Sequence, residues 1–217
     1  MNTGVIFDMD GVIIDSQPIH YQGDMLTLEY CNTHISLKEL QEYAGTSDES
    51  RFKRLKEKYK LKPSVKELTA YRENIMLELI ETSNLEAISG IKNLLSDVKE
   101  KAMKLALASS STRKFIDAVL CKLALKELFD TVVSGENISK SKPAPDIFLK
   151  AAELISCNPK TCVVIEDSAN GVNAAVNANM KCIGYINKNS GNQDITASTV
   201  IIDDFSQINA LFIKNLQ

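Results

Sequence analysis

The fold of this chain is decided by the stretch Val5-Ile6-Phe7-Asp8-Met9-Asp10-Gly11. Its apolar run predicts a buried strand, because it is too short for a helix and ends at turn residues. Asp8 and Asp10 follow where the strand ends, which is where open α/β sheets bind their ligands. Asp and Gly are also ordinary turn residues, so a solvated acid pair is the alternative reading.

The spacing of apolar residues changes near Ile88. Before it, from Asp15 to about Leu85, the spacing is helical and no convincing strand occurs. The four predicted helices there lie near Pro18–Tyr30, Leu37–Ala44, Asp48–Tyr59 and Ser64–Glu81. After it, helices alternate with strands predicted at Lys104–Ala108, Thr131–Val133, Thr161–Ile165, Cys182–Tyr185 and Thr199–Ile202. This alternation predicts a parallel sheet that is covered on both faces.

The predicted fold class is α/β, a Rossmann-like parallel sheet with an inserted all-helical cap. The first strand, Gly4–Asp8, has no partner unless it joins the later sheet. We therefore expect an α/β core made of residues 1–14 and 88–217, and a helical cap made of residues 15–87. The cap interrupts the core between its first and second strands.

Composition and charge exclude several classes of partner. The chain has 217 residues and a formal net charge of −3, which gives no electrostatic reason to expect nucleic acid or an anionic membrane. No apolar run approaches the roughly 20 residues of a membrane span, and no secretory signal is recognisable. The five cysteines include no CxxC pair, so we expect neither zinc nor disulfides. Buried thiols in the cytoplasm are the expectation.

Polar groups also follow two further predicted strands, and another lies just before a predicted helix. Ser109, Ser110 and Ser111 follow the second predicted strand, although Ser110 or Ser111 could simply cap the next helix. Lys142 precedes Pro143, which restricts it to an extended conformation, although the lysine could simply be solvated. Glu166 and Asp167 end another apolar strand, although a helix cap at Asp167 or Ser168 would explain one of these acids.

These groups form one chemically coherent set. Asp8, Asp10, Glu166 and Asp167 would crowd like charges together, which is costly unless a cation neutralises them. Oxygen ligands of this kind favour Mg²⁺, which often binds substrate phosphate as well. A lysine and a hydroxyl would hold the remaining phosphate oxygens. The set therefore favours phosphoryl transfer, which depends on positioning and charge stabilisation.

The chain resembles the haloacid dehalogenase superfamily, in particular the β-phosphoglucomutase-like subgroup with a helical cap. The resemblance rests on Asp8-Met9-Asp10-Gly11-Val12, Ala108-Ser109-Ser110-Ser111, Lys142-Pro143-Ala144-Pro145-Asp146 and Val164-Ile165-Glu166-Asp167-Ser168, which occur in the family's order. It implies Mg²⁺-dependent phosphoryl transfer through an aspartyl phosphate. We expect a phosphatase that acts on small sugar or polyol phosphates and needs no nucleic acid or membrane. A monomer is the default expectation for a capped enzyme of this size.

The resemblance also implies roles for the residues of the core. Asp8 would be the nucleophile and Asp10 the general acid and base. Ser109 and Lys142 would hold the transferring phosphoryl group. Asp8, Asp10, Glu166 and Asp167 would make up the metal site, with Asp10 contributing its backbone carbonyl and Glu166 and Asp167 binding directly or through water.

The cap is expected to set substrate choice. The candidate substrate-binding residues are His20, Gly45, Thr46, Ser47, Ser110 and Arg72. His20 could equally be a surface or partly buried residue, and for Arg72 we expect a solvated side chain on its helix. Closing such a cap would exclude water from the site.

The sequence leaves two alternatives open. A β-phosphoglucomutase would have an arginine directly after the Gly45-Thr46-Ser47 loop, where this chain has Asp48, and a cap tryptophan where it has Asp24. Both departures weaken the mutase alternative. A non-enzymatic phospho-receiver switch would also combine acids, a hydroxyl and a lysine around Mg²⁺. The Asp-x-Asp spacing and the long helical insertion argue against that reading.

Overall fold

The computed structural model describes residues 3–43 and 46–216, which divide into two compact units. The first unit consists of residues 1–15 and 85–217, and the second of residues 16–84. We call them the core and the cap. Among the described residues, no helix combines the length and the apolar character that crossing a membrane requires.

The core is a six-stranded sheet in which every neighbouring pair is parallel. The strands, in the order β3-β2-β1-β4-β5-β6, are Thr131–Ser134, Lys104–Ser109, Gly4–Phe7, Cys162–Glu166, Lys181–Tyr185 and Val200–Ile202. β1, the strand for which the sequence predicted no partner outside the later sheet, therefore lies between β2 and β4 and pairs with both. The α/β fold class with a helical insertion after the first strand is confirmed.

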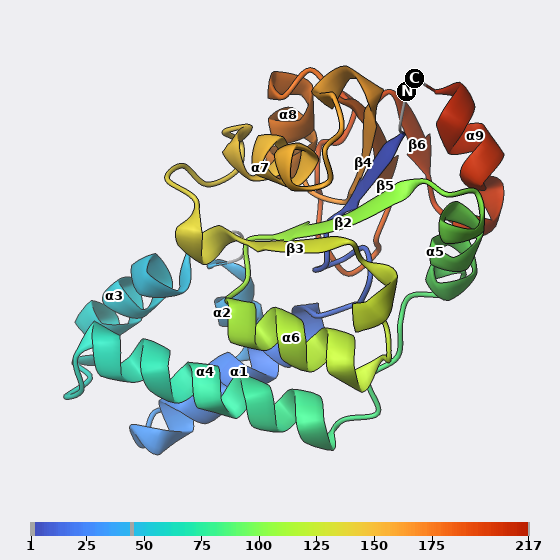
Figure 1. Ribbon diagram of the computed structural model, residues 1–217. Coiled ribbons are helices and arrows are strands. Elements are labelled where there is room, and N and C mark those ends of the chain that lie inside the picture. The colour runs from blue at the N-terminus through green and yellow to red at the C-terminus, as the bar shows by residue number, and fades with distance from the viewer. Residues whose placement is uncertain (1–2, 44–45, 217) are drawn as a thin grey trace. The chain divides into compact units, whose positions relative to one another are not determined.

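Helices cover both faces of this sheet. The core helices are α5 (Ile91–Glu100), α6 (Arg113–Lys122), α7 (Asp146–Leu154), α8 (Ala169–Asn177) and α9 (Ala210–Asn215). Ile6, Ala106 and Val164 are neighbours in register on the central strands and pack in one apolar cluster with α7 and α8. Figure 1 shows α7 and α8 together on one side of the sheet and α5 and α9 on the other. Because side chains alternate along a strand, both faces of the central strands are buried.

The cap contains four helices, α1 (Gln17–Tyr30), α2 (Leu37–Gln41), α3 (Asp48–Tyr59) and α4 (Val65–Thr82). The helix predicted to reach Ala44 ends at Gln41 instead. The capping box predicted from Ser64 and Glu67 is present at the start of α4, with both reciprocal hydrogen bonds made. A cluster that includes Leu28, Phe52 and Leu68 forms the apolar interior of the cap.

The cysteines follow the sequence prediction only in part. Cys157, Cys162 and Cys182 are buried in the core, where a thiol behaves as a small apolar group. Cys121 is exposed and Cys31 is half-buried, so the expectation of buried thiols is wrong for Cys121. Its place near the end of α6 lies on the solvent side of the helix, whose buried residues are Phe115, Ile116, Val119 and Leu120.

Candidate functional site

Three neighbouring strands place the predicted polar residues at one edge of the core sheet. β1 ends at Phe7, β2 at Ser109 and β4 at Glu166, and these strands are adjacent and parallel. Their carboxyl ends therefore meet. Asp8, Ser109, Glu166 and Asp167 are all at most 6 % exposed, although each carries a polar or charged group.

Lys142 lies between two of the acids. Its ammonium group donates to Asp8 Oδ1 at 2.5 Å and to Glu166 Oε1 at 2.7 Å. The lysine side chain is 8 % exposed, so the alternative of a solvated lysine is wrong. Burial lowers the pKa of Lys142, but the Asp8 and Glu166 carboxylates outweigh it and raise the pKa above its ordinary value. Lys142 therefore stays charged and partly neutralises both acids.

The Glu166 carboxylate accepts hydrogen bonds from the two residues that follow it as well as from Lys142. Its Oε2 accepts hydrogen bonds from the Asp167 and Ser168 backbone N–H groups, at 2.8 Å each, and from the Ser168 hydroxyl at 3.0 Å. Ser168 also caps α8, which settles which of the two candidate residues is the cap. Both oxygens of Glu166 are thus occupied by protein donors.

Asp10 points toward hydroxyl groups at the end of β2. Its Oδ2 accepts from Ser111 Oγ at 2.7 Å and from Ser109 Oγ at 3.2 Å. The cap of α6 is Thr112, so neither Ser110 nor Ser111 has that role. Ser110 is exposed, and Ser111, which contacts Asp10, was not among the predicted site residues. Ser111 lies in the bend after β2, where its N–H donates to Ser109 Oγ at 3.1 Å, so no periodic signal in the sequence pairs the two serines.

The electrostatics of the site fit a bound cation. Burial raises the pKa of Asp8 well above its ordinary value, although the positive charge of Lys142 lowers it. The neighbouring acids Glu166, Asp10 and Asp167 raise this pKa further. Burial and the Glu166 charge raise the pKa of Asp167 to about 7. Carboxyl groups whose charged forms are disfavoured in this way gain most from a nearby divalent cation.

The four predicted metal residues do not form one carboxylate cluster, however. Across residues 3–43 and 46–216, no group of three or more acid, imidazole or thiol side chains is placed to hold a metal ion. The physical reason is that Lys142 engages Glu166 and the serine hydroxyls engage Asp10. Asp8 Oδ1 accepts from Lys142 and Asp167 Oδ2 accepts from Ser190, so one oxygen of each of these two carboxylates is engaged by the protein.

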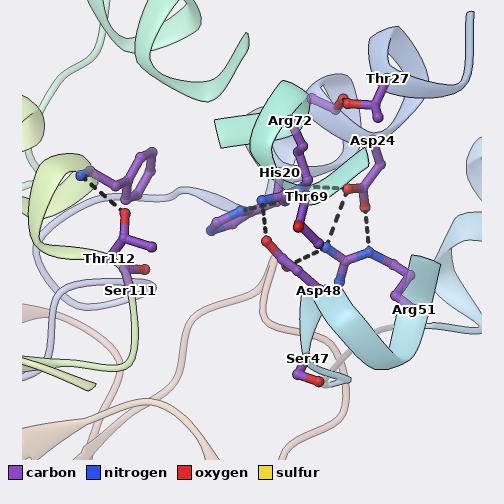
Figure 2. A network of polar contacts seen from close by, with 12 residues as sticks. His20, Asp24, Thr27, Ser47, Asp48, Arg51, Thr69, Arg72, Ser111 and Thr112 are labelled. Atoms are coloured by element: carbon purple, nitrogen blue, oxygen red, sulfur yellow. Dashed lines mark hydrogen bonds and ion pairs between the residues drawn. The ribbon is translucent and has the colours of Figure 1, made fainter. Parts of the chain in front are cut away.

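The cap has a polar network of its own, drawn in Figure 2. Asp24 lies between two arginines, with its Oδ1 2.5 Å from Arg72 Nε and its Oδ2 3.0 Å from Arg51 Nε. Asp48 pairs with the same arginines, at 2.5 Å from Arg51 Nη2 and 2.9 Å from Arg72 Nη1. His20 Nδ1 lies 3.0 Å from Arg72 Nη2. We call these five residues the cap network.

The network corrects one prediction about the cap. Arg72 is 5 % exposed, so the expected solvated side chain is wrong. The reason is that Asp24 and Asp48, from two other helices, supply the opposite charge that a buried arginine needs. Burial raises the pKa of Asp48, but Arg72, Arg51 and His20 outweigh it and hold the pKa below its ordinary value.

The remaining predicted cap residues differ in their surroundings. Thr46 donates from its hydroxyl to the Tyr43 carbonyl at 2.6 Å. Ser47 is exposed and caps α3 by accepting from the Ser50 N–H. Gly45 lies outside the described residues. Within the cap, His20, Thr46, Asp48, Arg51 and Arg72 are among the residues that line a cavity of about 170 Å³.

Comparison with known proteins identifies the family. A family model described as haloacid dehalogenase-like hydrolase matches residues 5–185. A Thermotoga maritima protein named phosphorylated carbohydrates phosphatase is 30 % identical over 183 residues, which cover 82 % of each chain. Escherichia coli hexitol phosphatase B is 29 % identical over 184 residues, which cover 82 % of this chain and 81 % of that protein.

A solved structure agrees with the fold. The crystal structure of β-phosphoglucomutase from Clostridium difficile has a TM-score of 0.81 and 29 % sequence identity, and it covers all of this chain and 97 % of that one. The similarity therefore extends over the cap as well as the core.

Proposed function

The chain belongs to the haloacid dehalogenase-like hydrolase family, and from that premise we propose that it is a Mg²⁺-dependent phosphatase of small sugar or polyol phosphates. The observation that carries the proposal is the buried contact of Lys142 with Asp8 and Glu166 at the carboxyl ends of β1 and β4. A cation fixed beside a buried carboxylate suits a site that must attack a phosphorylated, negatively charged substrate. The names of the T. maritima and E. coli relatives support this substrate class.

Asp8 is proposed as the nucleophile. Its carboxylate oxygen attacks phosphorus, the bond from phosphorus to the ester oxygen breaks, and the phosphoryl group remains on Asp8. Lys142 holds the carboxylate in place and offsets the charge of the phosphoryl oxygens, while Ser109 is the proposed second contact of that group. Asp8 and Asp167, with the backbone carbonyl of Asp10, would hold Mg²⁺, and Glu166 would support them through Lys142. Bound Mg²⁺ supplies neutralisation of phosphate charge.

Asp10 is proposed to move the proton. In the first half of the reaction its carboxyl group protonates the departing ester oxygen. In the second half its carboxylate accepts a proton from the water that attacks the phosphoryl-Asp8 group, which releases inorganic phosphate and restores Asp8. The hydroxyls of Ser109 and Ser111, which donate to Asp10, would fix the orientation of this group.

The cap network favours hydrolysis of monophosphates over mutase chemistry. A phosphoglucomutase must bind a second phosphate, and the obvious cations of the cap cavity are Arg51 and Arg72. Asp24 and Asp48 already pair with both of these arginines. A second phosphate would therefore meet a charge-balanced cavity and the half-exposed carboxylate of Asp48. The hydroxyl groups of a sugar or polyol suit this cavity better.

The assay that tests the proposal uses the purified protein with Mg²⁺ and a panel of hexitol and hexose phosphates. We expect release of inorganic phosphate, which stops when the metal is chelated. Asp8→Asn should lower kcat by at least about 10⁴-fold, as loss of a nucleophile does elsewhere, and leave the circular dichroism spectrum unchanged. Asp117→Asn is the matched control, because it removes a carboxylate that pairs with Arg113 on the surface of α6.

One outcome favours the second candidate function. The C. difficile structure keeps β-phosphoglucomutase open as an alternative. Conversion of β-glucose 1-phosphate to glucose 6-phosphate without release of inorganic phosphate would overturn the phosphatase proposal. Stable phosphorylation of Asp8 without turnover would instead support a phospho-receiver.

A further inference from the structure

The segment after β5, residues 186–194, contacts both of the acid-bearing loops of the core. We call it the β5 loop. Ser190 donates from its hydroxyl to Asp167 Oδ2, and Asn187 Nδ2 donates to the Gly11 carbonyl at 3.0 Å. Gln193 Oε1 accepts from the Ala169 N–H, at the start of α8, at 3.1 Å. Neither the family motifs nor the predicted site residues include any part of this loop.

The β5 loop is held in shape by its own side chains. Asn187 Oδ1 accepts from the Asn189 N–H at 2.8 Å, and the Ser190 N–H donates to the Asn187 carbonyl at 3.2 Å. Gln193 Nε2 donates to the Ser190 carbonyl at 3.0 Å. Ser190 therefore contacts Asp167 from a turn that hydrogen bonds within the loop hold in shape.

The Asp167 carboxylate lies directly against Gly11, the residue after Asp10. Gly11 has a φ of +84°, and a Cβ at this position would overlap the Asp167 carboxylate. The carboxylate thus fills the space beside Gly11, while Asn187 holds the carbonyl of the same residue. The Asp167 carboxylate therefore lies close against the loop that carries Asp8 and Asp10.

We propose that Ser190 is a positioning residue, which orients the Asp167 carboxylate for Mg²⁺. The inference rests on the proposed function, because it takes Asp167 as one of the groups that hold the cation. A hydrogen bond to one oxygen of a carboxylate fixes its rotation and leaves the other oxygen for the cation. Such partners of metal ligands typically contribute 10- to 100-fold to metal affinity.

The test is calorimetric titration of the phosphate-free protein with Mg²⁺ alone. Ser190→Ala should raise the Kd for Mg²⁺ by about 10- to 100-fold. Ser190→Thr keeps the hydroxyl and should restore most of the affinity. Asn192→Ala is the matched control, because it removes an exposed polar side chain from the same loop and should leave the Kd unchanged.

A purely structural role for Ser190 predicts a different result. It would lower the melting temperature of the metal-free Ser190→Ala protein and leave the Kd for Mg²⁺ at the wild-type value, which would overturn the inference. An equal loss of affinity in Ser190→Ala and Asn192→Ala would overturn it too. A wild-type protein that binds Mg²⁺ but hydrolyses no phosphate ester would contradict the proposed function alone, because the Kd comparison does not depend on turnover.

Discussion

At the scale of single residues, each acid of the core site is distinguished by its hydrogen-bond partners. Lys142 pairs with Asp8 and Glu166, whereas Ser111 and Ser109 donate to Asp10. Lys142 opposes the rise that burial causes in the pKa of Asp8, whereas a hydroxyl accommodates a carboxyl group in either protonation state. The two members of the Asp8–Asp10 pair are therefore suited to different tasks, although they are two residues apart.

A pH dependence of stability follows from Asp167. Its pKa is about 7 in the folded protein and near 3.8 when unfolded, so the folded state binds this proton more tightly. The resulting stabilisation is complete below pH 3.8 and is lost as the pH rises through 7. Without metal, the melting temperature of wild type should therefore fall relative to Asp167→Asn between pH 5 and pH 8. Thermal unfolding followed by circular dichroism measures this difference.

The asparagine variant is the control for all other titrating groups, because it differs from wild type only at Asp167. Added Mg²⁺ should reduce the difference at pH 8, where the carboxylate is ionised, and should have little effect at pH 5. A difference in melting temperature that is constant across this range would contradict the raised pKa.

At the scale of elements, the ends of parallel strands and the start of α8 bring the site together. β1 lies between β2 and β4, so three segments far apart in the sequence end side by side. α8 begins directly after Glu166 and Asp167, and its third residue, Gly171, leaves room for the Glu166 carboxylate. The first turn of this helix is therefore part of the site.

Gly171→Ala should destabilise the protein, although alanine is usually more favourable than glycine inside a helix by about 1 kcal/mol. A Cβ at this position would overlap the Glu166 carboxylate and displace the partner of Lys142. We expect a lower urea midpoint and a loss of phosphate release on the order of 10²-fold, typical of a displaced catalytic group. Asn170→Ala, on the exposed side of the same turn, should keep the wild-type urea midpoint and the wild-type rate of phosphate release. A Gly171→Ala protein with wild-type stability and activity would refute this role for the glycine.

At the scale of the whole molecule, the chain is two compact units with separate interiors. The core is built around its parallel sheet, and the cap around an apolar cluster together with the cap network. In the cap network, Asp24 compensates two buried arginines, so its loss would leave positive charge in the interior. Breaking such a buried pair typically costs about 3–5 kcal/mol.

Asp24→Asn should therefore destabilise the cap while the sheet of the core remains protected. Hydrogen exchange followed by mass spectrometry should show faster exchange in α1, α3 and α4 and unchanged exchange in β1, β2 and β4. Glu49→Gln removes an exposed charge from α3 and serves as the control. If exchange in the cap of Asp24→Asn equals that of wild type, the network does not hold the cap together.

The sequence predicted the fold more completely than the site. Local patterns were sufficient for the strands, for the helical insertion and for the capping box at Ser64, because each depends on residues close together in the chain. Lys142 was identified as a candidate residue, but its burial was not, since it depends on Asp8 and Glu166 from distant strands. Arg72 was expected in solvent for the same reason.

The sequence by itself determined the α/β class, the position of the helical insertion and the acids at the strand ends, because apolar spacing and chain order encode these features. Only the tertiary structure decided which acids pair with Lys142, which serines face Asp10 and that Ser190 contacts Asp167. Those contacts join residues more than 20 positions apart, and the identity of such a neighbour depends on how the strands are ordered in the sheet. The stretch from Val5 to Gly11 thus placed Asp8 and Asp10 at the end of a strand, and packing specified the hydrogen-bond partners of each carboxylate.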